Sequence, residues 1–465
     1  MKENFKGRDM YFNLEGGSLR YGEIPKLKHK VYRFLSEHGM LFSEINIRQQ
    51  VSLFIEEMEN GLAGRASSLK MLPAFLESVD RPNMDFTKPV IVLDAGGTNL
   101  RTALIGFDSK CTPVIKEISK TVMPGVDREV SKEEFFEAIA DTMANIINSG
   151  SSIGFVFSYP IEILPDRDGK LLNFTKEIKA AEVEGVEIGK TLMHYLKKKN
   201  PGAGKKISLL NDTVAALLAG VLAYPDRFYE SYAGLVLGTG MNASYFEKNR
   251  NISKLNYGKS HSGNNLSQII NIEAGNFSKG PIGAIDRKFD SLTLNPGAST
   301  YEKMFSGAYL GGLALMVLKE AVKSGMFSGE FSGKMGNLGQ LFSRDIDSFL
   351  NFPPETGSIF GNHISSFKAS DNVLLYFIFD ALIERAAVLV TTVIASIILK
   401  TGAGKNPCFP LCLTAEGSSF YRMKNFGLRV HCHLGNFLKG KKQHFLEIRG
   451  VDNAALLGGA AAALI

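Results

Sequence analysis

Residues 90–107 read VIVLDAGGTNLRTALIGF, an apolar run interrupted by a carboxylate, two glycines and a hydroxyl. Gly96 and Gly97 lack Cβ atoms, so phosphate oxygens can approach their backbone N–H groups closely, and Thr98 adds a donor. The segment lacks the P-loop pattern, and a strand-like stretch follows it where a Rossmann fingerprint needs a helix. We therefore predict a β-hairpin whose turn binds phosphate, with a plain hairpin turn as the alternative.

The carboxylate of Asp94 would repel a phosphate unless a cation lies between them. Mg²⁺ keeps several waters and typically uses one or two carboxylates together with substrate phosphates, so Asp94 is interpreted as an outer-shell anchor for Mg²⁺. Arg101 can pair with acidic groups or with phosphate. A second strand-turn-strand, YAGLVLGTGMNASYFE at residues 232–247, repeats this order. The two turns predict two related domains that clamp a nucleotide from both sides of a cleft.

A further carboxylate, Asp212, follows Asn211 at the end of the apolar strand pattern KISLL and precedes a helical pattern. Ligands bind at the C-terminal ends of strands in open α/β sheets. Capping of the helix by Asp212 or Thr213 would also explain these residues. Beside two phosphate turns, however, Asp212 is a candidate general base for a hydroxyl that attacks a γ-phosphate.

The elements that position these residues alternate between strand-like and helical segments, which favours an α/β architecture. The chain has 465 residues, 45% of them apolar, which is too long for one compact core and predicts two domains. Helical spacing dominates the first 80 residues, as in 43–63. The polar stretch 248–300 is expected to form loops, and the small residues of 453–465 are expected to form a closely packed helix.

Composition excludes several functions. The net charge of +6 is slight and dispersed, which argues against a nucleic-acid partner. The first residues are charged and polar, unlike a signal peptide, and the apolar run 386–399 is shorter than the roughly 20 residues of a membrane span, so a buried core helix is expected. We expect a cytoplasmic protein without a membrane partner. Its cysteines match no zinc pattern and are predicted to be reduced core residues: Cys111, Cys408, Cys412 and Cys432.

An ordered series of motifs covers nearly the whole chain: SSLKMLPAFL, LDAGGTNLR, GFVFSYP, LLNFTKEIKA, LLNDTVAALLAG, LGTGMNASYFE, NIEAG, NPGASTYEKMFSGAYLGGL, RAAVLVTTVIASIILKTG and AEGSSFYRM. In these motifs the chain resembles the hexokinase family of the actin-like ATPase superfamily. The resemblance implies a two-lobed α/β, ribonuclease H-like fold with a ligand cleft. The smaller lobe would comprise 84–213 and the C-terminal helix 450–465, and the larger lobe 1–83 and 214–449.

The resemblance also implies a role for each matching residue. Asp212 matches the catalytic base, and Lys176 offers a cation to the transferring phosphoryl group. The sugar-contacting positions are polar groups that can pair with hexose hydroxyls: Ser158, Thr175, Lys176, Asn211, Asp212, Asn242, Glu273 and Glu302. The nucleotide positions lie in the first turn (Asp94, Gly96, Gly97, Thr98, Asn99 and Arg101), the second turn (Gly238, Thr239 and Gly240) and the adenosine segment (Gly417 and Ser418).

The chain departs from the family pattern at the rim of the sugar pocket. Residues 174–177 read FTKE where the family has WTKG, and 273–275 read EAG where the family has EWG. The acidic stretch that normally follows is replaced by NFSKGPIG, and Glu416 replaces the usual aspartate. These changes bear on the choice of sugar.

The function implied by the resemblance is transfer of the γ-phosphoryl group of Mg-ATP to the 6-hydroxyl of a hexose, with glucose as the expected substrate. The hexose 6-phosphate would enter glycolysis. ATP and Mg²⁺ are the implied cofactors, and the protein is expected to be a monomer or a homodimer. Three alternatives remain open: a sugar sensor that barely turns over, a kinase for mannose, fructose or an amino sugar, and an ATPase of the actin or heat-shock chaperone type.

Overall fold

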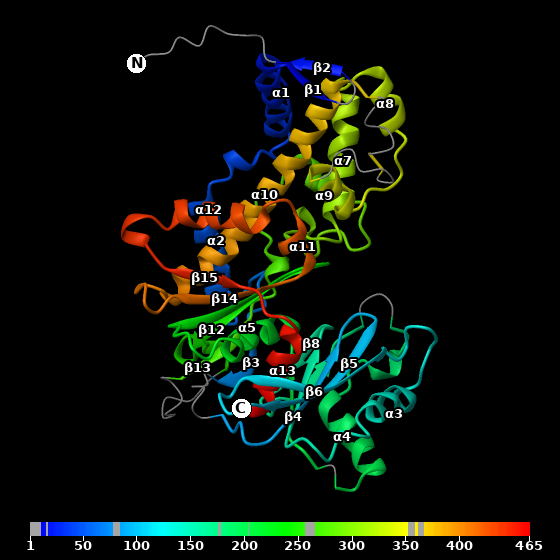
Figure 1. Cartoon of the computed structure of the whole chain (residues 1–465), viewed down its shortest axis with the longest axis vertical. Helices are drawn as coiled ribbons and strands as arrows, with labels where there is room; N and C mark the ends of the chain where they lie inside the picture. The colour runs from blue at the N-terminus through cyan, green and yellow to red at the C-terminus, as the bar shows by residue number, and fades with distance from the viewer. Residues whose placement is uncertain are drawn as a thin grey trace.

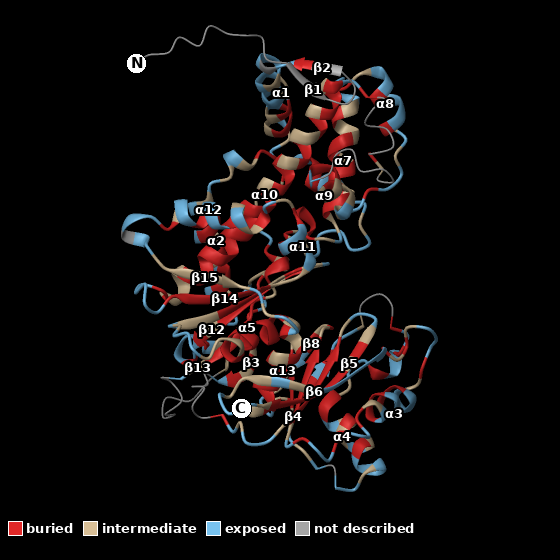
Figure 2. Cartoon of the chain, in the orientation of Figure 1, coloured by how far each residue is buried: buried red, intermediate tan, exposed pale blue. Residues whose placement is uncertain are grey.

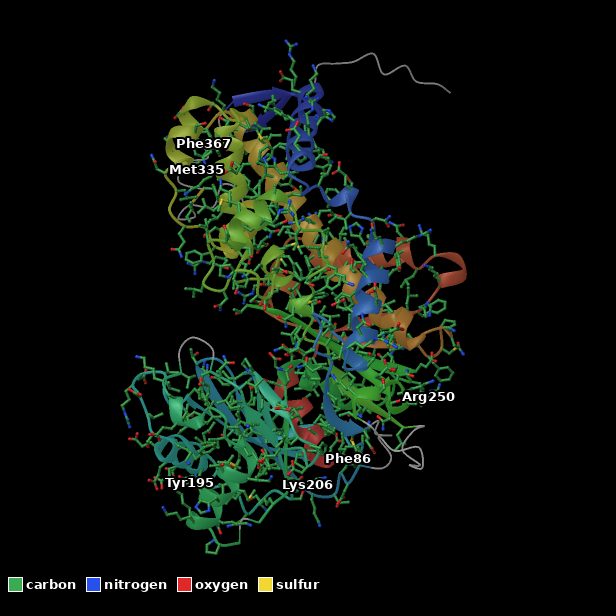
Figure 3. All side chains as sticks on the ribbon, turned by 180° about the vertical axis from the view of Figure 1, so that it is seen from behind. Phe86, Tyr195, Lys206, Arg250, Met335 and Phe367 are labelled. Carbon is green, nitrogen blue, oxygen red and sulfur yellow. The ribbon has the colours of Figure 1, made fainter. Side chains whose placement is uncertain are left out.

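A computed structural model describes residues 11–14, 17–77, 84–174, 178–202, 204–255, 266–351, 359–360 and 367–465. The molecule is elongated and consists of two bodies (Figure 1). The larger body contains the N-terminal helices, and the C-terminus lies at the smaller body. Seen from behind, Met335 and Phe367 mark the far end of the larger body, while Tyr195 and Lys206 lie in the smaller one (Figure 3).

The smaller body is built on a five-stranded sheet of order β10-β7-β4-β5-β6. Its first three strands form an antiparallel meander, and β7 and β10 then add in parallel to β4. The strands are β4 (Val90–Ala95), β5 (Asn99–Phe107), β6 (Pro113–Val122), β7 (Ile153–Phe157) and β10 (Ile207–Leu210).

Alternate residues of this sheet face two separate cores. Ile91 and Leu93 pack with α3 (Lys132–Thr142) and α4 (Ile188–Lys199). Val90 and Val92 pack instead with α5 (Asp212–Ala223) and α13 (Ala454–Leu464). The continuous apolar pattern VIVL of the sequence is therefore explained by burial on both faces.

The larger body contains a second sheet, of order β15-β14-β11-β12-β13-β3. Its meander β11-β12-β13 is extended by β14 and β15 in parallel to β11, which repeats the order of the smaller sheet, and β3 adds an edge. This repetition confirms the predicted two-lobed α/β fold. The strands are β3 (Leu72–Glu77), β11 (Ser231–Leu237), β12 (Met241–Lys248), β13 (Ser267–Asn271), β14 (Leu411–Glu416) and β15 (Leu446–Arg449).

Helices surround α10 (Ala369–Thr401), which forms the axis of the larger body. This helix is long and apolar enough to span a membrane, but 89% of its most apolar window is buried inside the protein, as Figure 2 shows. The predicted core helix is therefore confirmed, with bounds wider than 386–399. The other helices of this body are α1 (Ile24–Glu37), α2 (Ile47–Leu62), α6 (Ala284–Asp290), α7 (Leu310–Lys323), α8 (Gly329–Met335), α9 (Ser343–Asn351), α11 (Ser418–Arg422) and α12 (Phe426–Phe437).

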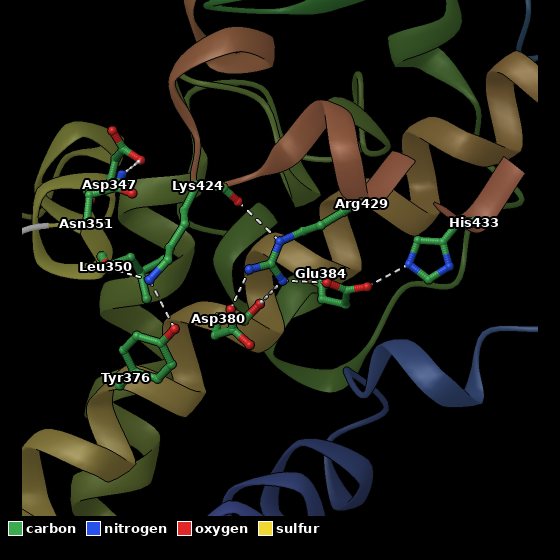
Figure 4. A network of polar contacts seen from close by, with 9 residues as sticks. All are labelled: Asp347, Leu350, Asn351, Tyr376, Asp380, Glu384, Lys424, Arg429 and His433. Carbon is green, nitrogen blue, oxygen red and sulfur yellow. Dashed lines mark hydrogen bonds and ion pairs between the residues drawn. The ribbon is translucent and has the colours of Figure 1, made fainter. Parts of the chain in front are cut away.

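A polar network fastens α12 to α10 (Figure 4). Arg429 of α12 donates a 2.5 Å bond to Asp380 and a second bond to Glu384. The other carboxylate oxygen of Glu384 lies 2.7 Å from Nε2 of His433. The helix that follows the predicted adenosine segment is thus tied by charged contacts to the core helix.

Helix α5 contacts both sheets, and α13 packs on α5 and on the strands β4, β7 and β10. These helices approach each other and the sheet at glycines. A Cβ atom on Gly154 would lie 1.9 Å from the carbonyl oxygen of Gly459, and one on Gly458 would lie 2.0 Å from that of Ala215. Because α5 belongs to the packing of both bodies, the lobe boundary placed at residue 213 stays a prediction.

Two expectations need correction. Stretch 248–300 contains strand β13 and helix α6 as well as loops, because the short apolar run SQIIN pairs with strands on both sides. All four cysteines are free, but only Cys412 is buried, whereas Cys408 and Cys432 are exposed. Cys408 lies in a turn before β14 and Cys432 faces outward on α12, so the apolar neighbours in sequence did not indicate burial.

Candidate active site

A cavity of about 650 Å³ lies between the two bodies and brings nine of the predicted site residues together. The smaller body contributes the first glycine turn and the residues after β7 and β10: Gly96, Gly97, Ser158 and Asp212. The larger body contributes the second turn and the predicted sugar positions: Thr239, Gly240, Asn242, Glu273 and Glu302. Thr175 and Lys176 lie outside the described residues, so their predicted roles stay predictions.

The backbone of the first turn is hydrogen-bonded by a tyrosine that was not predicted from the sequence. The hydroxyl of Tyr159, which is 2% exposed, lies 2.8 Å from the carbonyl oxygen of Gly96 and 3.1 Å from that of Gly97. The amide of Asn99 donates to the hydroxyl of Thr98 over 2.9 Å. The N–H of Gly96 closes the turn by donating to the carbonyl of Asn99 at 3.0 Å, so within the described structure the N–H groups of Gly97 and Thr98 are the ones left to an anion. Tyr159 belongs to the motif FSYP, of which only Ser158 was predicted to be a site residue.

Asp94 and Arg101 are cross-strand partners in the hairpin and form an ion pair. Arg101 donates through Nε at 2.8 Å and through a terminal nitrogen at 2.5 Å, both to Oδ2 of Asp94. Of the two partners predicted for Arg101, an acid or a phosphate, the structure shows the acid. Burial raises the pKa of Asp94 above its ordinary value, although Arg101 opposes this shift.

Asp212 is the first residue of α5, and its carboxylate is not the cap of the helix. Asn211 is the N-cap, since its side-chain oxygen accepts a 2.9 Å bond from the N–H of Thr213. Asn211 therefore has a structural role as the cap of α5. It is not among the described residues that line the cavity, and its predicted contact with the sugar stays a prediction. Asp212 accepts a 3.2 Å bond from the hydroxyl of Thr213. Its pKa is raised by burial and further by the charges of Glu273 and Asp94.

A third carboxylate, Glu416 at the end of β14, interacts electrostatically with Asp94 and Asp212. Its pKa is raised to about 7, chiefly by burial and then by the charges of Asp212 and Asp94. Carboxylates from both sheets therefore concentrate negative charge at one place, which favours a bound cation.

The wall predicted to bind sugar is a connected network of amides and carboxylates. Asn242 donates to Oδ1 of Asn271 at 2.7 Å, and Asn271 donates to Oε1 of Glu273 at 2.8 Å. Glu302 accepts a 3.0 Å bond from the N–H of Met241. A Cβ atom on Gly240 or Gly275 would lie 2.9 Å from Glu302, so glycines at these positions allow the carboxylate its place. Asn271 was not predicted, because a single Asn at the end of a strand has no distinctive pattern.

The second turn also contacts the predicted adenosine segment. The N–H of Gly307 and the hydroxyl of Ser419 both donate to the carbonyl of Gly238, at 2.8 and 3.1 Å. Gly417 has φ +103°, and a Cβ there would lie 2.2 Å from the carbonyl oxygen of Leu237. Its neighbour Ser418 begins α11. The predicted segment is therefore close to the second turn, with Ser419 as the side chain that makes the contact.

Two more cavity residues were missed, Asn276 and Ser299. The hydroxyl of Ser299 lies 3.0 Å from Oδ1 of Asn276. Asn276 belongs to the stretch NFSKGPIG, whose departure from the family pattern was the only sequence signal of a change in the pocket. Ser299 belongs to NPGAST and had no such signal.

The geometry defines a class of protein: two α/β lobes of matching strand order, each with a glycine turn, around a polar cavity with a carboxylate at its base. This is the actin-like ATPase fold with a polar cavity between its lobes. The chain belongs to the hexokinase family. Two family models described as hexokinase match residues 35–222 and 232–465.

Individual relatives agree with this assignment. Hexokinase-3 of Homo sapiens is 32% identical over 302 residues, which are 62% of this chain and 30% of that protein. The chain thus spans about a third of the length of the mammalian relatives that it matches. Hexokinase-7 of Oryza sativa subsp. japonica is 30% identical over 370 residues, 75% of this chain and 78% of that protein.

Solved structures support the fold. The hexokinase from Schistosoma mansoni complexed with glucose has a TM-score of 0.72 at 24% identity, and covers 95% of this chain and 99% of its own. A second hexokinase crystal structure has a TM-score of 0.74 at 19% identity, with the same coverage.

Proposed function

We propose that the protein transfers the γ-phosphoryl group of ATP to the 6-hydroxyl of a hexose, with glucose as the substrate. The observation that carries this proposal is the position of Asp212. Its carboxylate is released from helix capping by Asn211 and shares one cavity with the first glycine turn and the amide–carboxylate wall. An actin-type or chaperone-type ATPase has no use for that wall.

In the proposed reaction, Asp212 accepts the proton of the 6-hydroxyl as that oxygen bonds to the γ-phosphorus, and the bond from the γ-phosphorus to the β–γ bridging oxygen breaks to release ADP. The wall of Asn242, Glu273 and Glu302 would bind the other hydroxyls, because each hydroxyl is both donor and acceptor and matches an amide or a carboxylate. The two turns would hold the phosphates by their N–H groups. Closure of the lobes would exclude water, which competes with the hexose as acceptor.

The acidic residues fit a magnesium ion bound with the nucleotide. Both bonds that Arg101 makes with Asp94 end on Oδ2, so Oδ1 can accept from a water of the hydrated ion. The pKa values of Asp212 and Glu416 are raised first by burial and then by neighbouring carboxylates, and a cation would relieve this second cause. When bound, Mg²⁺ supplies charge neutralisation on the β- and γ-phosphate oxygens.

The cytoplasm is the proposed compartment, and the four free cysteines support it, since such thiols persist where the redox poise is reducing.

Initial rates with Mg-ATP across glucose, mannose, fructose, glucosamine and N-acetylhexosamines test the proposal. We expect sugar 6-phosphate to form, with the highest kcat/KM for glucose. A higher kcat/KM for another sugar would move the assignment to that hexose. Sugar binding without turnover would indicate a sensor, and hexose-independent release of phosphate from ATP would indicate an ATPase.

A further inference from the structure

We propose that Asn276 binds one hydroxyl of the hexose and that Ser299 positions it, so that this pair helps to determine which sugar the pocket accepts. The inference rests on the proposed function and deepens it. Asn276 and Ser299 come from two different loops, yet both line the cavity beside Glu273 and Glu302.

The hydrogen bonds of Asn276 leave part of its amide available to a ligand. Oδ1 accepts from the hydroxyl of Ser299 at 3.0 Å, and Nδ2 donates to the backbone carbonyl of Glu273 at 3.3 Å. An amide has two N–H donors and two lone pairs on its oxygen. Within the part of the chain that the structure describes, one donor and one lone pair therefore remain, which is the set that a sugar hydroxyl can satisfy as acceptor and donor.

Ser299 is held in place by a clamp on its own loop. The ammonium of Lys303, which is 4% exposed, donates to Asp290 at 2.6 Å, to Thr293 at 2.8 Å and to the carbonyl of Asn295 at 2.6 Å. Asp290 also accepts a 2.8 Å bond from the N–H of Gly297. The loop that carries Ser299 is therefore fixed at several points before the sugar arrives.

Asn276 is fixed in the same way from its own side. It ends a short 3-10 turn that starts after Glu273, and its N–H lies 3.1 Å from the carbonyl of Glu273. Glu273 itself has a left-handed backbone, φ +61°. A rigid amide beside two sugar-binding carboxylates discriminates strongly, because an analogue lacking the matched hydroxyl leaves the amide unpaired.

The test compares substrate analogues rather than activity alone. We would measure kcat/KM, and also Kd by calorimetry without nucleotide, for glucose and for 1-, 2-, 3- and 4-deoxyglucose. The proteins are the wild type, Asn276→Ala, Ser299→Gly and Ser278→Ala. Ser299→Gly removes the hydroxyl at a position with φ +48°, which glycine adopts without strain. Ser278 is exposed, in the same stretch as Asn276, and serves as the matched control.

We expect Asn276→Ala to lower kcat/KM and affinity for glucose by roughly 3- to 10-fold, the size of one neutral hydrogen bond. For one deoxyglucose the loss should vanish, since its partner hydroxyl is already missing. Ser299→Gly should show a weaker loss with the same analogue dependence, and Ser278→Ala none.

An equal loss for glucose and every deoxyglucose would overturn the assignment of Asn276, while hexose phosphorylation itself would stand. A wild-type protein that neither binds nor phosphorylates any hexose would overturn the proposed function and the assignment together.

Discussion

At the scale of single residues, the charge of the cleft is set by Asp94, Asp212 and Glu416. Each is a carboxylate in a largely enclosed place, and the pKa of each is raised by burial. Among the residues that the structure describes, Asp94 alone of the three has a cationic partner at ion-pair distance, Arg101. The three groups therefore differ in what their removal should do.

Asp212→Ala should lower kcat by roughly 10²- to 10⁴-fold, the cost of losing a general base. Affinity for the hexose should change far less, because the wall on the larger lobe remains. The measurement is kcat from initial rates together with calorimetric Kd for glucose. Thr213→Val is the matched control, since it removes the hydroxyl that bonds Asp212 and keeps the carboxylate. Near-normal turnover of Asp212→Ala would exclude the residue as the base.

Asp94→Asn should raise the Mg²⁺ concentration needed for half-maximal rate, while glucose binding without nucleotide stays unchanged. The physical reason is that an amide binds a hydrated cation more weakly than a carboxylate. Rates are measured over a magnesium titration at fixed ATP. An unaltered magnesium dependence would mean that Asp94 serves only to pair with Arg101 in the hairpin.

The raised pKa of Glu416 should make the free energy of unfolding depend on pH. Its pKa is about 7 in the folded protein and near 4.5 when unperturbed, so between these values the folded state binds more protons than the unfolded state. The contribution of Glu416 to the free energy of unfolding is therefore highest below pH 4.5, and it decreases as the pH rises from 4.5 to about 7. Glu416→Gln should remove this decline. The check is the difference in thermal unfolding midpoint between the two proteins across the pH range. Parallel profiles would contradict the shifted pKa.

The residues that could be predicted from the sequence are those in patterns that a motif carries, such as Gly96, Gly97 and Asp212. Tyr159, Asn276 and Ser299 could not be predicted, because what makes each of them part of the site is a contact across the fold. Even for Asp212 the sequence left helix capping open. The choice was made by the side-chain oxygen of Asn211, whose bond to Thr213 is a matter of geometry.

At the scale of elements, the presence of two similar hairpins was predictable and helix length was not. The two hairpins carry matching patterns, and the sheets repeat as those patterns indicate. The first half of α10 was missed because it contains charged residues. These are paired with distant partners: Arg385 with Asp286 at 2.5 and 2.9 Å, and Asp371 with Ser328 at 2.5 and 3.0 Å. No local pattern reveals that a charge will find such a partner.

The glycine contact between β7 and α13 gives a prediction at this scale. Gly154→Ala places a Cβ within 1.9 Å of the Gly459 carbonyl, so backbone has to move, and overpacking of this kind costs about 1–3 kcal/mol. The free energy of unfolding from urea titration should fall accordingly. Gly333→Ala, on the exposed side of α8 with nothing within 4 Å, is the control and should be neutral or slightly stabilising. Equal effects of both changes would contradict tight packing at β7.

At the scale of the whole molecule, the proposed sugar site is divided between the two bodies. Ser158 and Asp212 follow strands of the smaller sheet, whereas Asn242, Glu273 and Glu302 lie on the larger body. A ligand that bonds to both parts binds best when they are close together, and it shifts the population towards closure by that difference in affinity.

Saturating glucose without nucleotide should therefore reduce the radius of gyration measured by small-angle scattering. Glu302→Ala should make this reduction smaller, because the larger body loses one of its proposed hydrogen bonds to the sugar. Calorimetry on the same samples establishes that the sugar is bound. An unchanged scattering curve with glucose demonstrably bound would show that the sugar does not bridge the lobes as proposed, or that the protein is closed beforehand.

The position of α13 has a consequence for biosynthesis. The strands of the smaller sheet are made by residue 210, but the helix that covers Val92 and Val156 together with α5 is made only after residue 453. Until then the part of this apolar face that α13 covers is exposed, and such surfaces bind chaperones or aggregate. A nascent chain halted just before α13 therefore has all the proposed catalytic residues and still becomes a target for quality control instead of a folded enzyme.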